Sequence, residues 1–384
     1  MRKMMFLLPF AALAMASCTN NEDAVVQSSA LENQAVKIFP QVGGTTRGVV
    51  ETTASISEFK VILNGNFSTS VTGTGVAGTY GPEIVTKGTS GWSMGTPYYW
   101  GDATTAGKFT AFAPSTLTPS EGKVSYSVSS TLADQKDLLV AYNEGSKTDF
   151  ASGVPLHFRH AMSQIVVKAS YADDADATLL ASYPSKVVKV KGIKFFNLNN
   201  SGTLTLPTAS TASGEDYESA WSGHAGSESF EVELGTAITL GSTATTIDLS
   251  EAANPLLLLP QTTAATTAFP QNTTTATTTA TGAYLAVKVN ITEGGSAYYP
   301  ANDATGYEWV AVPVSIDWKG GSKYIYTLNF SNLALGAIAP GTTGDVLPTG
   351  KVAGNPLPAA LLTPVNFLVT VEDEWTEYPL TPSF

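Results

Sequence analysis

Apolar and polar residues alternate along much of the chain, and the clearest case lies in the first half. Within residues 154–159, the first, third and fifth residues are Val, Leu and Phe, and Pro, His and Arg stand between and after them. This is the period of a β-strand with one buried face. A continuous apolar run precedes it at 138–141, and a β-branched run that suits a pleated surface follows at 165–167. No stretch here has the period of a helix, so we predict three strands.

The rest of the chain repeats this pattern in short pieces separated by Gly, Asn and Ser. Further strands are predicted at 36–39, 49–63, 108–114, 124–128, 186–198, 203–206, 230–234, 246–249, 284–291, 312–318, 324–330 and 364–375. Asn64-Gly65 is a hairpin signal, whereas residues 171–182 suit a linker or a short helix. The Thr/Ala-rich residues 262–281 favour an extended or loop conformation over a helix. Many short strands at close spacing are typical of a β-sandwich.

Composition agrees with strands and turns and narrows the functional classes. The chain has 384 residues, enough for two domains, with 34 Gly and 21 Pro, and only 14% of its residues are charged. Its net charge is −12. An acidic surface repels phosphate backbones, so we predict no nucleic-acid partner.

The single cysteine falls at an informative place. Arg2 and Lys3 precede an apolar segment, residues 6–16, that is too short to span a bilayer permanently. Small residues then lead to Cys18, which resembles the lipobox of bacterial lipoproteins. We therefore predict a signal peptide at 1–17 and acylation of Cys18, which anchors a chain to a membrane surface without spanning it. The alternative is an ordinary signal peptide followed by a chance cysteine.

Candidate chemistry is sparse. His157 and His160 are three residues apart, and in a strand they face opposite sides, so they do not converge on a metal. His224 stands alone in a polar stretch. The sequence contains no Gly-x-Ser-x-Gly elbow, phosphate loop or dinucleotide fingerprint. We predict no enzyme, no cofactor and no metal site. The aromatic residues at 92–100 suit either a sugar-stacking platform or, more often, a sandwich core.

Several short motifs, taken in order, resemble those of the fimbrillin family, the pilin-like lipoproteins of Gram-negative gut and oral anaerobes. These motifs are YYW at 98–100, FTAFAP at 109–114, DLLVA at 137–141, FRHAMSQI at 158–165, LLPQ at 258–261 and GSKYIYTL at 321–328. Each motif is weak alone, but their order covers most of the chain. The resemblance implies two tandem β-sandwich domains with transthyretin-like folds, which we divide into residues 48–171 and 172–384. The remaining residues, 18–47, are then a lipidated tail with a removable strand.

The resemblance also implies a function. It suggests a structural subunit of a cell-surface fimbria at the outer membrane, with other fimbrial subunits as partners and with surface receptors in adhesion or biofilm formation. Cleavage between Arg47 and Gly48 would free the strand at 36–39. The terminal strand of a neighbouring subunit, with Val365, Phe367, Val369 and Val371 on one face, would replace it. The alternative function is a surface glycan-binding lipoprotein of a polysaccharide-uptake system.

Overall fold

The described residues fold mainly into strands. The computed structural model describes residues 35–42, 56–89, 91–173, 181, 184–209, 220–243, 245–246, 256–265, 272–273, 276–277, 282–300, 303–331, 359–360 and 366–372. Strands dominate the regular structure of these segments, which also include one short 3-10 turn, η1 (Leu132–Asp134). The predicted all-β fold class is therefore confirmed.

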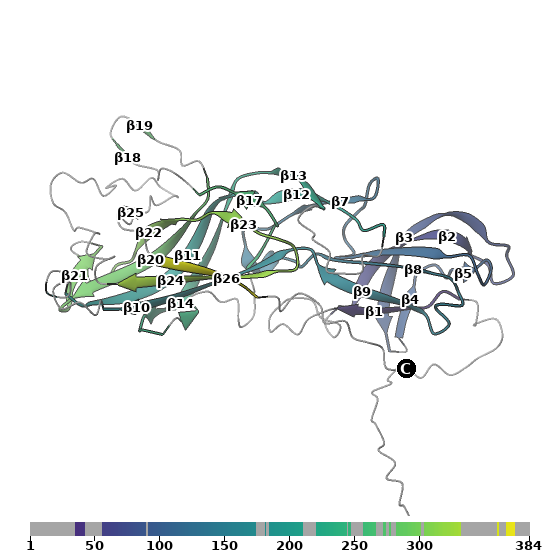
Figure 1. Cartoon of the computed structure of the whole chain (residues 1–384), viewed down its shortest axis with the longest axis horizontal. Coiled ribbons are helices and arrows are strands. Elements are labelled where there is room, and N and C mark those ends of the chain that lie inside the picture. Colours follow the sequence, from purple (N-terminus) through teal and green to yellow (C-terminus); the bar gives the residue numbers. More distant parts are fainter. Residues whose placement is uncertain are drawn as a thin grey trace, which may run out of the picture.

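The first sheet lies at one end of the elongated molecule (Figure 1). Its strand order is β1-β9-β8-β6-β2-β3-β4, and β5 also pairs with β2. The strands are β1 (Ile38–Val42), β2 (Glu58–Ser68), β3 (Val76–Gly88), β4 (Gly91–Met94), β5 (Tyr99–Trp100), β6 (Gly107–Ala113), β8 (Leu139–Gly145) and β9 (Val154–His160). Neighbouring strands are antiparallel except for β1, which runs parallel to β9.

This sheet encloses an apolar cluster of its own, which we call the first cluster. It contains several aromatic rings in contact: Phe59 contacts Phe158 with ring centroids 4.9 Å apart, and Phe67 contacts Phe109 at 5.7 Å. The alternation predicted for the strand at 154–159 is observed, because Val154, Leu156 and Phe158 are fully buried while His157 is exposed. The period of the sequence thus selects the face of the sheet that packs inward.

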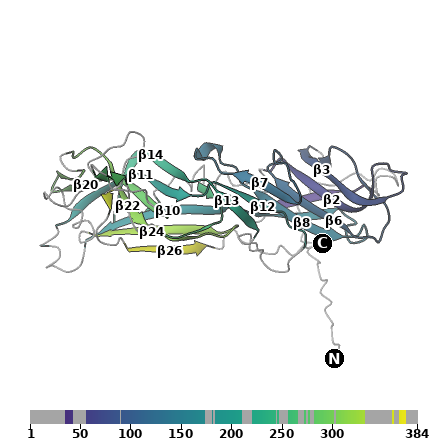
Figure 2. The ribbon, with the colours of Figure 1, turned by 90° about the horizontal axis from the view of Figure 1, so that it is seen from above.

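Two further sheets occupy the other end of the molecule (Figure 2). One has the order β15-β10-β24-β26, with β16 on β10, and the other has β14-β11-β20-β22-β25, with β21 on β20. The sheet built on β10 comprises β10 (Ser163–Ala172), β15 (Thr245–Thr246), β16 (Leu256–Leu258), β24 (Lys323–Ser331) and β26 (Asn366–Glu372). The sheet built on β11 comprises β11 (Lys186–Leu198), β14 (Glu228–Thr239), β20 (Tyr284–Glu293), β21 (Ser296–Tyr299), β22 (Glu308–Pro313) and β25 (Ala359–Ala360).

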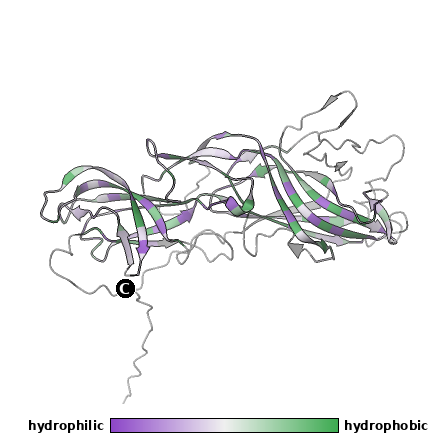
Figure 3. Cartoon of the chain, turned by 180° about the vertical axis from the view of Figure 1, so that it is seen from behind, coloured by the Kyte–Doolittle hydropathy of each residue, from purple (hydrophilic) through white to green (hydrophobic). Residues whose placement is uncertain are grey.

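Side chains of both sheets form a larger second cluster. It includes Ile165 and Val167 of β10 and Val287 of β20, all fully buried, and Trp318 donates its indole N–H to the Tyr326 hydroxyl at 2.8 Å. Hydrophobic and hydrophilic residues alternate along these strands (Figure 3). The pattern agrees with sheets that bury one face.

A small fourth sheet and two strand pairs complete the fold. The fourth sheet joins β7 (Lys123–Ser127), β12 (Ser201–Thr205) and β13 (Trp221–Ala225) in the order β13-β12-β7. The pairs are β17 (Thr262–Thr263) with β23 (Ile316–Asp317), and β18 (Asn272–Thr273) with β19 (Ala276–Thr277). The described parts of the Thr/Ala-rich stretch are thus extended, as predicted, and its other residues lie outside the described segments.

One predicted turn is wrong. Asn64-Gly65 is not a hairpin turn, because β2 continues through both residues to Ser68. Asn64 pairs with Thr79 of β3 on one side and with Lys108 of β6 on the other. Pairing on two sides outweighs the local turn preference of this dipeptide, as tertiary context commonly does in sheets.

The predicted linker at 171–182 is only partly described. Tyr171 and Ala172 still belong to β10, so the strand continues past the point at which the sequence suggests a break. The division into residues 48–171 and 172–384 stays a prediction.

Candidate subunit-assembly site

The strand β1 lies in a slot at the margin of the first sheet. On one side it pairs with β9, with Ile38 opposite Val154 and Val42 opposite Phe158. The Val154 amide donates to the Lys37 carbonyl at 2.7 Å. On the other side the Val36 amide donates to the Tyr98 carbonyl at 2.8 Å, and Ala35 forms an antiparallel bridge with Tyr99. The segment that ends in β1 is thus held between β9 and the start of β5.

Alternate side chains of this segment enter the first cluster. Val36 and Ile38 are 5% and 4% exposed, and Pro40 is also buried, whereas Lys37 and Phe39 are half-buried. The sequence predicted a strand that stops before Pro40, but β1 runs to Val42. In a parallel ladder every second residue bonds to a given neighbour. The bond to the Lys37 carbonyl therefore implies that the backbone groups of Lys37, Phe39 and Gln41 point towards β9. Pro40, which has no N–H, lies between them and does not interrupt the hydrogen bonds on that side.

Tyr98, on the side of the slot opposite β9, has a hydroxyl whose pKa is raised. Burial raises the pKa of Tyr98 to about 12, and a hydrogen bond from its hydroxyl to Glu83, 2.8 Å long, adds to the effect. Tyr98 and Trp100 are 5% and 6% exposed. Two of the aromatic residues at 92–100 are therefore buried in the first cluster, whereas Trp92 and Tyr99 are half-buried. These buried rings act as core packing and are not available as a sugar platform.

The predicted donor strand lies at the edge of another sheet. Phe367, Val369 and Val371 belong to β26, which pairs antiparallel with β24, so that Val369 lies opposite Tyr326. β26 is the last strand of its sheet order. An edge strand has one neighbour and can leave without separating an inner pair. Val365, Cys18, Arg47 and Gly48 lie outside the described residues.

Comparison with known proteins identifies the family. A profile of the fimbrillin-like family matches residues 46–346. The chain belongs to the fimbrillin-like family. Among solved structures it is similar to a fimbrial protein from Bacteroides vulgatus, with 15% identity, a TM-score of 0.49, and coverage of 79% of this chain and 96% of that chain. It is also similar to a proposed cell adhesion protein from Bacteroides ovatus, with 15% identity, a TM-score of 0.38, and coverage of 78% and 93%. No curated protein sequence matches.

Family membership supports the coarse functional prediction. Fimbrillin-like proteins are structural and not enzymatic, and membership supports a fimbrial subunit at the cell surface that assembles with other subunits. Within the described residues, no group of three or more His, Cys, Asp and Glu side chains is placed to hold a metal ion. The described segments also contain no helix long and apolar enough to cross a membrane.

The two neighbouring histidines of this fimbrillin-like protein face opposite sides of β9, as predicted. His157 is exposed, whereas His160 is 1% exposed and its Nδ1 lies 2.6 Å from Oδ2 of Asp137, which is also buried. The sequence pattern did not predict this pair, because the two residues are 23 positions apart. It links the start of β8 to the end of β9, next to the second cluster, and we assign it a structural role.

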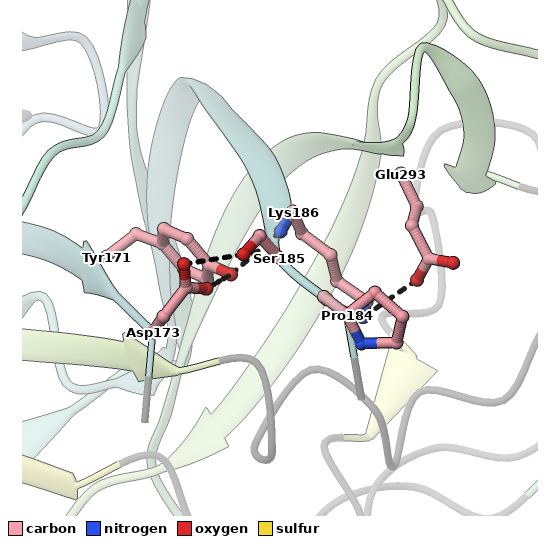
Figure 4. A network of polar contacts seen from close by, with 6 residues as sticks. All are labelled: Tyr171, Asp173, Pro184, Ser185, Lys186 and Glu293. Atoms are coloured by element: carbon pink, nitrogen blue, oxygen red, sulfur yellow. Dashed lines mark hydrogen bonds and ion pairs between the residues drawn. The ribbon is translucent and has the colours of Figure 1, made fainter. Parts of the chain in front are cut away.

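A second polar network joins residues of β10, β11 and β20 and the segments beside them (Figure 4). The Tyr171 hydroxyl donates to Asp173 at 2.7 Å and accepts the Lys186 amide at 2.8 Å, and the Ser185 hydroxyl donates to Asp173 at 2.6 Å. The Lys186 ammonium, 1% exposed, lies 3.0 Å from Glu293 and donates to the Pro184 carbonyl at 2.9 Å. Sequence reasoning missed this network, since it treated Lys186 only as the start of a strand. It ties the end of β10 to the start of β11 and to the end of β20.

Proposed function

We propose that this protein is a lipid-anchored fimbrial precursor that polymerises by strand exchange after cleavage between Arg47 and Gly48. The observation that supports this most directly is the position of β1 between β9 and Tyr98. A segment near the amino end fills a slot between β9 and Tyr98 with alternate buried side chains. Such a segment is a separate piece of the first sheet that one cut can release. Its departure would leave unpaired backbone groups and apolar side chains, which form a template for another strand.

The cut falls at a suitable distance. Arg47 is five residues beyond Val42, the last residue of β1, in the sequence GGTTRG, whose glycines and threonines suit an accessible cleavage site. The next described strand, β2, begins at Glu58. Cleavage at this point would therefore separate β1 from the rest of the sheet without breaking any other described strand.

The donor is the segment that contains β26. Its apolar residues Val365, Phe367, Val369 and Val371 recur at every second position, the spacing needed to fill the pockets that alternate side chains of β1 leave. Burial of each such side chain is worth about 1.5–3 kcal/mol, so four of them with the ladder bonds would make a joint that opens slowly. The contact is head-to-tail and does not close on itself, so filaments follow. We propose the outer membrane as the place of the anchor and adhesion and biofilm formation as the role of the filament.

Limited proteolysis and electrophoresis test the proposal. We expect the precursor cut by a trypsin-like protease to give ladders of multimers that resist mild detergent. Arg47→Ala should stay uncut there and monomeric, whereas Arg47→Lys, a matched control that the protease still recognises, should polymerise. Removal of residues 364–384, or Phe367→Asp, should leave cleaved monomers. Normal polymerisation of the cleaved, truncated protein would contradict this donor assignment.

The anchor and the rival function need their own readouts. Metabolic labelling with palmitate should mark the wild type and not Cys18→Ala. The glycan-binding alternative predicts saturable binding to a defined polysaccharide and no ladders after cleavage. A protein that binds a polysaccharide in this way and stays monomeric would favour that alternative.

A further inference from the structure

The two ends of the chain carry the same seven-residue pattern. Residues 36–42 read VKIFPQV, and residues 365–371 read VNFLVTV. Aligned without a gap, both begin and end with Val, have a polar residue at the second and sixth positions, and are apolar at the third, fourth and fifth. The fourth position is unusual for a strand with one buried face, because it is apolar on the outward side: Phe39 in one segment and Leu368 in the other.

The structure gives the outward residue Phe39 a specific contact. Phe39 lies beside Gly153, which precedes β9 with a φ of +122°. A Cβ built on Gly153 would be only 2.2 Å from Cε2 of Phe39 and 3.1 Å from Cβ of Lys37. Only glycine therefore leaves room for the ring at this position. The hollow over Gly153 is a feature of the slot that receives an outward side chain and not a buried one.

The buried face alone does not fix the register of an incoming strand. Val365, Phe367, Val369 and Val371 are all apolar, so a shift by two residues still presents apolar side chains to the first cluster. The outward side chains do differ. A shift by two would bring Asn366 or Thr370, in place of Leu368, over Gly153 and would leave the hollow without an apolar occupant of matching size.

We propose that the donor strand of a neighbouring subunit enters parallel to β9, in the register that puts Leu368 on Gly153 in the place of Phe39. Val365 then takes the place of Val36, and Thr370 that of Gln41, opposite His157. The inference rests on the proposed strand exchange. It adds the register and the residue pair that selects it, and it takes the direction from β1, which runs parallel to β9. Gly153 and Leu368 act as positioning residues for assembly.

Disulfide trapping tests the register directly. Thr370→Cys in one subunit is combined with His157→Cys, Pro155→Cys or Arg159→Cys, and cleaved protein is assembled and oxidised. Release of residues 1–47 removes the only native cysteine, Cys18. Adjacent strands lie about 4.8 Å apart, within the range that a disulfide spans. We expect the His157→Cys pair to crosslink severalfold more than the other two.

A second arm tests the role of Leu368. Leu368→Phe, which copies Phe39, should keep the crosslink at position 157. Leu368→Asn should spread crosslinking to positions 155 and 159, and the control Asn366→Ser, on the same face, should not. A cleaved parent that forms no multimers contradicts both the proposed function and this inference. Multimers that crosslink mainly through position 155 or 159, or that ignore Leu368→Asn, overturn only the register.

Discussion

Single residues of the second polar network make stability depend on pH. Asp173 accepts hydrogen bonds from the hydroxyls of Ser185 and Tyr171, and these bonds lower the pKa of its carboxyl below the ordinary value. A carboxyl whose pKa is lower in the folded state stabilises the fold above its unfolded pKa, which is about 3.9, and this contribution disappears as the pH falls through the folded pKa.

We therefore expect Asp173→Asn to destabilise the protein at neutral pH and to approach the wild type in acid. Because Asp173 is exposed, the loss should be no more than about 1 kcal/mol. Urea unfolding at a series of pH values measures it, with Asp134→Asn in the exposed 3-10 turn as the control. A difference between Asp173→Asn and the wild type that stays constant as the pH falls through the acid range would contradict this assignment, since the lowered pKa of Asp173 predicts that the difference shrinks there.

At the scale of the element, a bulge in β11 explains where the sequence pattern weakens. Val188 and Val190 alternate with exposed or half-buried neighbours, but Gly192 and Ile193 are both buried. Pairing shifts between Val190 and Gly192 on both sides, against β14 and against β20. A bulge adds one residue and reverses the facing of the residues that follow. The loss of alternation after Gly192, visible in the sequence, is the signature of that bulge.

Substitution of Gly192 should therefore be costly. A Cβ at this position would lie 2.6 Å from the Val232 carbonyl oxygen of β14. We expect Gly192→Ala to lower the free energy of unfolding by about 1–3 kcal/mol, the usual cost of an overpacked site. Gly235→Ala is the matched control, because a Cβ there meets nothing within 4 Å. Equal unfolding midpoints in urea for the two variants would contradict this prediction, because β14 would then move aside at the bulge without a measurable cost.

The elements could be predicted from the sequence to the extent that local pattern determines them. The strands at 154–159, 186–198 and 324–330 were all predicted, because alternation and β-branched residues report which face is buried. The parallel pairing of β1 with β9 was not, since it joins residues more than 100 positions apart. The buried Asp137–His160 pair, 23 positions apart, and the contact of Phe39 with Gly153 were not predicted either, because each joins residues in or beside different strands. These contacts depend on the assembled sheet, and no local period encodes them.

At the scale of the whole molecule, the two clusters are joined and not merely adjacent. Phe112 of β6 and Val140 of β8 belong to strands of the first sheet, yet their side chains lie in the second cluster. Hydrogen bonds cross the same region: the Trp221 indole donates to the Ala161 carbonyl and the Leu257 amide to the Gln135 side chain, each at 2.9 Å. Loss of one cluster would therefore expose buried groups of the other.

We accordingly expect the cleavage-resistant Arg47→Ala precursor, which stays monomeric, to unfold in a single cooperative transition. Phe109→Ala lies wholly in the first cluster and should cost about 3–5 kcal/mol. Phe112→Ala, in the joint, serves as the comparison. Native-state hydrogen exchange measures the effect on each strand. If the molecule is one cooperative unit, Phe109→Ala lowers the protection of slowly exchanging amides in β20 and β24 as much as in β2 and β6. Protection that falls only in the first sheet would instead favour two independently folding units, as the predicted division into residues 48–171 and 172–384 implies.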